Sequence, residues 1–245
     1  MPAKPKPLRP HEERQLARRR PPGEVPPGAP RPGDSFLIVT EGAVTEKLYF
    51  ECLRDALRLD ANLVRVVHPP YTDAEGLVRA AMNYYDQDDR GIRWGKLTSG
   101  GRDTEIIDHV WVLFDTDVPH RQGQLEPAMK LAVAEHIHVG HSTPSVELWL
   151  LLHFRDRPGP LLNSSAAEHA VGDAWGQAYE KSKDRFPRLW ADLEPKIPIA
   201  VPRGADTRRY HRDANSPFPA NPSTELDLLV LALNAATQPQ LRIIS

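Results

Sequence analysis

Residues 35–40 read SFLIVT and are followed by Glu41, and residues 110–114 read VWVLF and are followed by Asp115. Both runs are short, apolar and rich in β-branched residues, which is typical of strands that are buried on both faces. Strands of this kind occur in parallel sheets that helices cover on each side. The two runs therefore predict an α/β protein in which an acidic residue follows each of two core strands.

The segments around these strands have the spacing of helices. In EGAVTEKLYFECLRDAL, residues 41–57, apolar side chains recur every three or four positions, and Thr45 is the expected N-cap. The other elements expected up to residue 136 are a strand over 62–67 and helices over 73–85 and 125–136. This alternation predicts a parallel sheet flanked by helices, with ligands gathered at the carboxyl ends of its strands.

Composition divides the chain into three regions. Residues 1–34 are rich in proline and charge and bury too little apolar surface to offset their ordering entropy, so we expect a disordered basic arm. Residues 35–160 form the expected α/β core, which is interrupted by an aperiodic surface insertion over 86–108. Residues 161–245 are expected to be a mainly helical C-terminal region, whose last helix begins at Ser223 with that residue or Thr224 as its cap.

Several classes of protein are excluded by the composition of the 245 residues. The single cysteine, Cys52, can form no disulfide within the chain, and its place in an amphipathic stretch indicates packing. No charge-free apolar run reaches about 18 residues and no signal peptide is recognisable, so a cytoplasmic protein without a membrane segment is expected. There is no Gly-x-x-x-x-Gly-Lys-Ser/Thr loop for ATP and no Gly-x-Ser-x-Gly elbow of a hydrolase.

The acidic residues at the strand ends are the most informative feature. Glu41 and Asp115 should meet at one edge of the sheet, and Asp117 should project to the same side as Asp115 if the segment is extended. Carboxylates without a cysteine or histidine set suit Mg²⁺ or Mn²⁺, which would assist attack of water on a phosphodiester. Glu41 could instead be a general acid or base. A structural alternative is that each acidic residue binds the N-terminal amides of the next helix.

Three further residues near these motifs have both a functional and a structural interpretation. Gly42 permits either a close approach of the backbone to a phosphate or an ordinary turn. Glu147 lies in the apolar segment VELWLLLHF, where it would meet either a metal or a structural ion-pair partner. His153 in the same segment would either contact phosphate or water, or be hydrogen-bonded in the core.

The basic residues of the chain fall into clusters, although the net charge is only −2. Any attraction to nucleic acid must therefore be local. The candidates for phosphate contacts are Lys181, Lys183, Arg203, Arg208, Arg209 and Arg212, with Tyr210 and His211 available for stacking on unpaired bases. A second cluster, Arg14 and Arg18 to Arg20, lies in the N-terminal arm. A solvated surface is the competing interpretation for both clusters.

The histidines at 136, 138 and 141 invite a zinc interpretation, but lack the ligand set that zinc requires.

Two sets of motifs resemble known families. FLIVTEG and VLFDTD resemble the Toprim signature of topoisomerases, bacterial primases and OLD-type nucleases. EGAVTEKLYF, VWVLFDTD, TPSVELWLLLHF and NPSTELDLLVLAL together resemble the RloB-like family of bacterial proteins found beside restriction and phage-defence loci. The Toprim resemblance implies a small α/β domain that holds Mg²⁺ at Glu41, Asp115 and Asp117. The RloB-like resemblance, over most of residues 35–236, implies a defence role through nucleic-acid cleavage and an ATPase partner. The VPHRQG that follows Asp117 departs from the usual pattern.

These observations lead to three hypotheses. The first is a Mg²⁺-dependent endonuclease of antiviral defence that cuts DNA or RNA, tRNA included, with Glu41, Asp115, Asp117 and Glu147 in the catalytic site. The second is a non-catalytic sensor or effector subunit that binds nucleic acid or a partner ATPase. The third is a nucleotidyl- or phosphotransferase acting on small nucleotides, because the same metal site can handle any phosphoryl group.

Overall fold

The structure is a computed structural model that describes residues 30–71, 73–82, 107–117 and 123–244. Most of the expected N-terminal arm and of the expected insertion lies outside the described residues. Five strands form one sheet in the order β2-β1-β3-β4-β5. They are β1 (Phe36–Thr40), β2 (Val64–Val67), β3 (His109–Asp115), β4 (His138–Thr143) and β5 (Ser223–Thr224). The first four run parallel and β5 runs antiparallel to β4, which confirms the predicted α/β class.

The register of the sheet brings the ends of three strands together. Thr40 at the end of β1 lies opposite Leu113 of β3, and Asp115 at the end of β3 lies opposite Ser142 of β4. Glu41 therefore follows β1 at the same edge where Asp115 ends β3, as the sequence predicts for parallel neighbours. Residues that follow β4 reach this edge as well.

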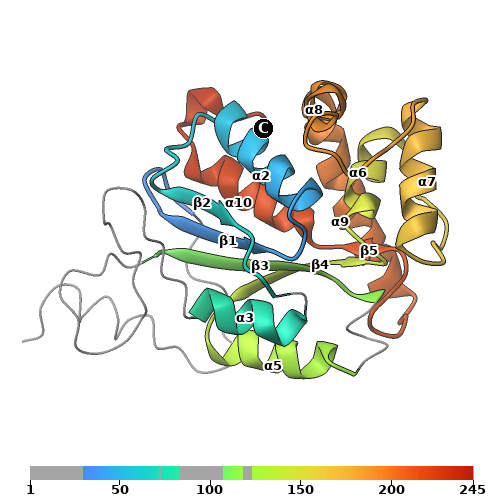
Figure 1. Ribbon diagram of the computed structural model, residues 1–245, viewed down its shortest axis with the longest axis horizontal. Helices are drawn as coiled ribbons and strands as arrows, with labels where there is room; N and C mark the ends of the chain where they lie inside the picture. Colours follow the sequence, from blue (N-terminus) through green and yellow to red (C-terminus); the bar gives the residue numbers. More distant parts are fainter. Residues whose placement is uncertain (1–29, 72, 83–106, 118–122, 245) are drawn as a thin grey trace, which may run out of the picture.

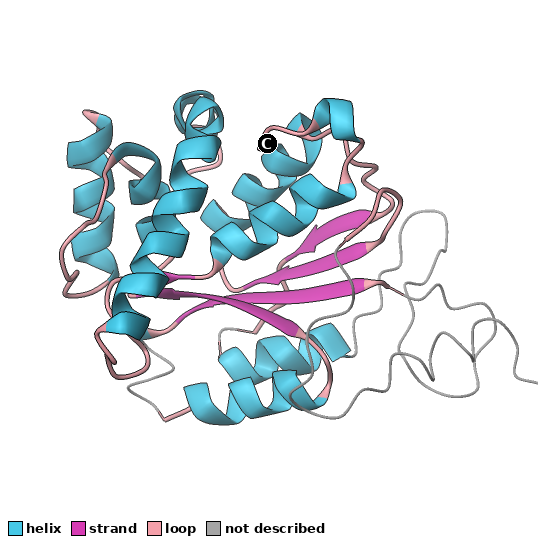
Figure 2. Ribbon diagram, turned by 180° about the vertical axis from the view of Figure 1, so that it is seen from behind, coloured by secondary structure: helices cyan, strands magenta, loops and turns pink. Residues whose placement is uncertain are grey.

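Helices cover both faces of the sheet. One face is covered by α3 (Ala74–Met82) and α5 (Leu125–Ala134), which lie below the sheet in Figure 1. The remaining helices lie on the other side of the sheet, as the view from behind in Figure 2 also shows. They are α2 (Thr45–Ala56), α6 (Glu147–Phe154), α7 (Ser164–Trp175), α8 (Phe186–Leu193), α9 (Ile197–Asp213) and α10 (Leu226–Ala236), with short 3-10 turns at Glu194–Lys196 and Pro239–Leu241. None of the described helices combines the length and apolarity needed to cross a membrane.

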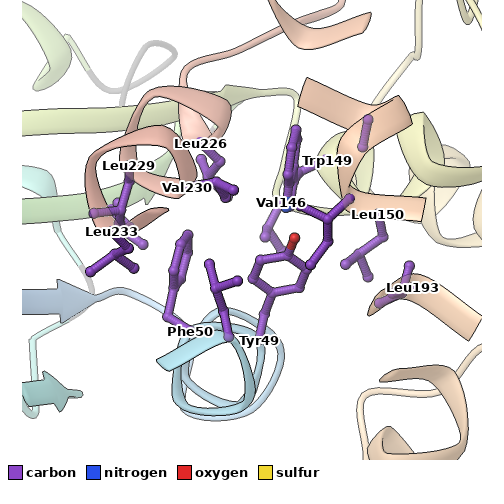
Figure 3. Close-up of a cluster of buried hydrophobic side chains, with 14 of the residues drawn as sticks. Tyr49, Phe50, Val146, Trp149, Leu150, Leu193, Leu226, Leu229, Val230 and Leu233 are labelled. Carbon is purple, nitrogen blue, oxygen red and sulfur yellow. The ribbon is translucent and has the colours of Figure 1, made fainter. Parts of the chain in front are cut away.

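Alternation along the strands divides the apolar side chains between two cores. Leu37, Val39, Val112 and Phe114 pack towards α3 and α5. Phe36, Ile38, Trp111 and Leu113 point the other way, into a larger core that includes residues of α2, α6 and α8 to α10. Figure 3 shows side chains of α2, α6 and α10 meeting there. The C-terminal region thus shares this core with the first strand and helix, and Cys52 packs at its margin.

Three sequence-based expectations about this fold are wrong. The N-cap of α2 is Val44 and makes no side-chain capping bond, while the hydroxyl of Thr45 is paired with Tyr179. The last helix begins at Leu226, because Ser223 and Thr224 pair with β4 as a strand. The strand β4 itself was not expected, since HVGHST has few apolar residues, although its last four residues are buried.

Candidate active site

The carboxylate of Glu41 is fixed directly beside Asp115. Glu41 donates its amide to the carbonyl of Leu113 at 3.0 Å, which continues the pairing of β1 with β3 beyond the last strand residue. The amide of Asp115 in turn donates to Oε2 of Glu41 at 2.8 Å. Burial raises the pKa of Glu41 to about 7 against the lowering effect of this bond, and Glu46 and Asp117 raise it further. Glu41 is thus an acid whose proton can be exchanged near neutral pH.

Asp115 lies between the end of β3 and the start of α6. Its Oδ1 accepts a hydrogen bond of 2.8 Å from the amide of Val146, the residue that precedes α6. Burial raises the pKa of Asp115 well above its usual value, and the neighbouring carboxylates of Glu46, Glu147 and Glu41 add to the shift. The Asp115 carboxylate is therefore surrounded by other acids.

Glu46 is a further acidic residue at this site, and it was not predicted. It lies in the first turn of α2, is only 5% exposed, and accepts a hydrogen bond of 3.2 Å from the amide of Gly42. Burial raises its pKa, as does the negative charge of Glu147. A Cβ atom at position 42 would overlap the Glu46 carboxylate. Glycine at this position thus leaves room for the orientation that the Glu46 carboxylate adopts, which neither earlier interpretation of Gly42 included.

Glu147 is fully buried and has three polar partners. Ser145 donates to Oε2 at 2.7 Å, and the hydroxyl of Tyr179 donates to Oε1 at 2.8 Å. The ammonium group of Lys181 lies 3.1 Å from the same Oε1. Glu147 is thus fixed in position by the segment before α6 and by the loop that follows α7. The ion pair with Lys181 agrees with the structural interpretation of Glu147. The arrangement is also compatible with the other interpretation, in which Glu147 binds a metal.

Lys181 is the cation that faces the acidic cluster. It pairs with Glu168 of α7 at 3.0 Å as well as with Glu147, and its side chain is 42% exposed. Burial lowers the pKa of Lys181, but the two glutamates outweigh burial and raise it. Its charge lowers the pKa of Glu41, Glu46 and Asp115. One ammonium group therefore faces the carboxylates of Glu41, Glu46, Asp115 and Glu147, hereafter the acidic cluster.

Asp117 is oriented differently from the prediction. The strand ends at Asp115 and Thr116 forms a bend, so the alternation of an extended chain does not reach Asp117. Its Oδ2 accepts a hydrogen bond of 2.9 Å from Ser164 at the start of α7. Asp117 still raises the pKa of Glu41 through its charge. It therefore lies at the edge of the acidic cluster, with α7 as a neighbour.

The donor atoms of the cluster suit a hard divalent cation. They are carboxylate oxygens, which Mg²⁺ and Mn²⁺ prefer, and their mutual repulsion would be relieved by a positive ion. In the ranges that the structure describes, however, no three His, Cys, Asp or Glu side chains have the arrangement of a preformed metal site. Glu41, Glu46 and Asp115 instead accept hydrogen bonds from backbone amides. The residues fit Mg²⁺ in chemistry, and small side-chain rotations would have to complete the coordination.

The other basic candidates have different surroundings from Lys181. Arg208 binds both carboxylate oxygens of the buried Asp227 and donates to the carbonyl of Thr224 at 2.7 Å. Arg209 is exposed and pairs with Asp206 at 2.6 Å, and Lys183 is exposed. Among the predicted cations in the part of the chain that the structure describes, Lys181 is the one that contacts the acidic cluster.

His153 lies in the core. Its Nδ1 faces the carbonyl of Trp149 at 2.9 Å and its Nε2 faces the hydroxyl of Tyr49 at 3.2 Å. Burial lowers the pKa of His153 to about 3, so the ring is neutral at physiological pH. The suggested histidine set is also dispersed, because His138 stacks on Trp111 and His141 lies 2.9 Å from Glu225.

Comparisons with known proteins identify a family. The model of the RloB-like protein family matches residues 36–233, from β1 to α10. No curated protein and no solved structure gives a match. The matched span contains every residue of the acidic cluster, together with Asp117, Tyr179 and Lys181.

Proposed function

The chain belongs to the RloB-like protein family, and we propose that it is a metal-dependent nuclease that hydrolyses phosphodiester bonds of DNA or RNA, tRNA included. The observation that carries the proposal is the acidic cluster, in which four carboxylates, one following β1 and the others from α2, β3 and α6, lie close to Lys181. Buried like charges are costly to maintain and are characteristic of sites that bind a cation or exchange protons. The family resemblance to defence proteins supports a role against phage, in the cytoplasm and with an ATPase partner.

Each residue of the site has a distinct part in this proposal. Glu41, Glu46, Asp115 and Glu147 would hold Mg²⁺ or Mn²⁺, with Asp117 at the margin. The bound ion would supply a water of lowered pKa and neutralise charge on the phosphoryl oxygens. Lys181, which is partly exposed, would contact a phosphate oxygen of the substrate. Tyr179 and Ser145 would keep the Glu147 carboxylate in one orientation. Glu41, with a pKa of about 7, would be the acid or base if it does not bind the ion.

Cleavage of labelled DNA, bulk RNA and tRNA tests this function, each with Mg²⁺, Mn²⁺ or EDTA. We expect cutting that requires the metal and is lost in Asp115→Asn. The matched control is Glu51→Gln, because Glu51 lies on α2 at the surface and pairs with Lys47. Cleavage that persists in Asp115→Asn would contradict the assignment.

A second function is favoured by one observation, that Glu41, Glu46 and Asp115 accept hydrogen bonds from backbone amides. In that case the protein is a sensor subunit that binds nucleic acid or a partner ATPase without turnover. Binding of the same nucleic acids with no cutting, by a folded protein with Mg²⁺ and with Mn²⁺, would distinguish this function. The transferase hypothesis would require turnover of mononucleotides in the same assay.

A further inference from the structure

A small pocket lies beyond the edge strand β5. Its volume is about 190 Å³, and the residues that line it include His141 of β4, His211 and Arg212 of α9, Phe218 of the following loop and Glu225 before α10. This volume equals that of roughly six water molecules and is smaller than the usual range for small-molecule sites. The pocket therefore suits a single ring system, and it lies outside the acidic cluster.

Aromatic rings form one side of this pocket. Phe218 is 58% exposed, and its ring meets the ring of His141 edge to face at 5.3 Å. His211 is held at both nitrogens, by the hydroxyl of Ser216 at 3.0 Å and the carbonyl of Pro222 at 2.9 Å. An exposed phenyl ring beside rings that are already fixed offers a platform on which a flat ligand can stack.

The charges around the pocket favour a neutral ligand with a polar edge over a free anion. Arg208, which also lines the pocket, is bound to Asp227. His141 is 4% exposed, and its Nδ1 lies 2.9 Å from the carboxylate of Glu225 but has, within the described chain, no hydrogen bond of normal geometry. Arg212 is mostly exposed and its nearest acid, Asp213, is 3.9 Å away. The pocket thus offers an acceptor in its wall and one cation that solvent can reach.

We propose that this pocket binds one unpaired base of a nucleic-acid strand, with the base stacked on Phe218 and an exocyclic amino group donating to Glu225. Stacking on an aromatic side chain is a general means of holding single-stranded nucleic acid. A carboxylate only accepts hydrogen bonds, so the exocyclic amino group of adenine, cytosine or guanine can donate to Glu225. Uracil and thymine have no such group and could offer only their ring N3–H, so we expect them to bind less tightly. Arg212 would meet a neighbouring phosphate.

The position of the pocket relative to the acidic cluster is compatible with one strand reaching both. Ser142 of β4 is opposite Asp115 on one side and Thr224 of β5 on the other. Glu225 directly follows β5 and donates its amide to the carbonyl of His141. Two strand spacings, roughly 10 Å, therefore separate the backbone of Asp115 from that of β5. The inference rests on the proposed function in one respect, namely that the bound base is part of a nucleic-acid strand.

Binding of labelled ten-nucleotide RNA homopolymers of A, C and U in EDTA tests the pocket without cleavage. We expect the A and C strands to bind more tightly than the U strand, and Phe218→Ala to weaken their binding roughly 10-fold to 100-fold. Phe218→Trp should retain the affinity. Val133→Ala, which removes exposed apolar surface from α5, should leave it unchanged. Glu225→Gln should reduce the preference over U, because an amide can also donate to a carbonyl.

The inference is overturned if Phe218→Ala binds as wild type, or if the base preference is unchanged in Glu225→Gln. Cleavage assays in Mg²⁺ separate this failure from that of the proposed function. Cutting by a wild-type protein whose binding does not depend on Phe218 rejects the pocket and keeps the nuclease. Binding that depends on Phe218, with no cutting under any metal, keeps the pocket and rejects the nuclease.

Discussion

The amide of Asp115 donates a 2.8 Å hydrogen bond to the carboxylate of Glu41, so the acids that follow two neighbouring strands are joined through the backbone. This bond fixes where the Glu41 carboxylate lies, but it does not neutralise that group. Burial and the surrounding acids still raise the pKa of Glu41 to about 7. The sheet therefore sets the geometry of the site, but nothing in the Glu41–Asp115 bond neutralises the negative charge of the carboxylates.

The stability of the metal-free protein should fall with pH because of Glu41. Its pKa is raised from 4.5 to about 7 in the folded state, so between these values the folded chain holds more protons than the unfolded chain. The free energy of unfolding then decreases as pH rises through this window. We expect urea unfolding in EDTA to show that wild type loses on the order of 1–3 kcal/mol more than Glu41→Gln between pH 5 and pH 8. Mg²⁺ should restore part of the loss at pH 8. Equal losses in both proteins would show that folding does not raise the pKa of Glu41.

Glu46→Gln should strongly slow cleavage while preserving the fold. The amide keeps an oxygen to accept the bond from Gly42, but it removes a negative charge from the acidic cluster. We expect the cleavage rate to fall by about 100-fold and the Mg²⁺ concentration for half-maximal rate to rise. Glu51→Gln on the same helix should cut as wild type. If both variants cut equally well, Glu46 has no part in the reaction.

Tyr179→Phe tests whether the tyrosine positions Glu147. The variant loses only the hydroxyl that donates to Glu147 and is paired with Thr45. Because Lys181 and Ser145 remain, we expect a destabilisation of about 1 kcal/mol. The catalytic rate constant should fall about tenfold, with little change in the KM for nucleic acid, since the hydroxyl orients an acid and does not contact substrate. Val133→Ala on the exposed face of α5 is the control. A larger KM with an unchanged rate constant would instead indicate substrate contact by Tyr179.

Arg208→Met should lower the free energy of unfolding of the protein itself, and not only weaken its binding of nucleic acid. Asp227 is fully buried, and burial raises its pKa against the opposing effect of Arg208. Removal of the arginine leaves an uncompensated buried acid, which typically costs about 3–5 kcal/mol. Denaturant unfolding should show this loss, and it should be largely recovered in Arg208→Met/Asp227→Leu. Arg209→Met, at an exposed pair, should have little effect on stability. A stable Arg208→Met protein with weakened nucleic-acid binding would support the sequence-based assignment to phosphate contact.

The parts of the fold that were predictable have strong apolar patterns. β1 and β3 are continuous apolar runs, and α2 and α6 are defined by buried residues such as Phe50 and Trp149. β4 was missed because its polar side chains are buried through specific partners, for example Ser142, whose hydroxyl is hydrogen-bonded to Thr224. Such pairings join residues far apart in the chain, so local composition does not reveal them.

The acidic cluster was predictable only in part, for a related reason. Strand-end acids can be recognised because parallel strands bring their ends to one edge. Glu46 is on a helix, and only the packing of α2 against the sheet shows that its face reaches Asp115. Lys181 was one basic residue among several, and its proximity to Glu147 depends on the loop after α7. The available signal for Glu46 was an acidic residue in the first turn of the helix that follows the first strand.

β5 and α10 lie near the end of the sequence, so the sheet and the larger core are completed late in synthesis. A ribosome makes the chain from its N-terminus, so residues 223–236 emerge after all the carboxylates of the acidic cluster. Before that point, β4 has an unpaired edge, and Phe50 lacks the α10 side chains that pack in the same core. A nascent chain thus carries every proposed ligand but not the finished sheet that aligns them.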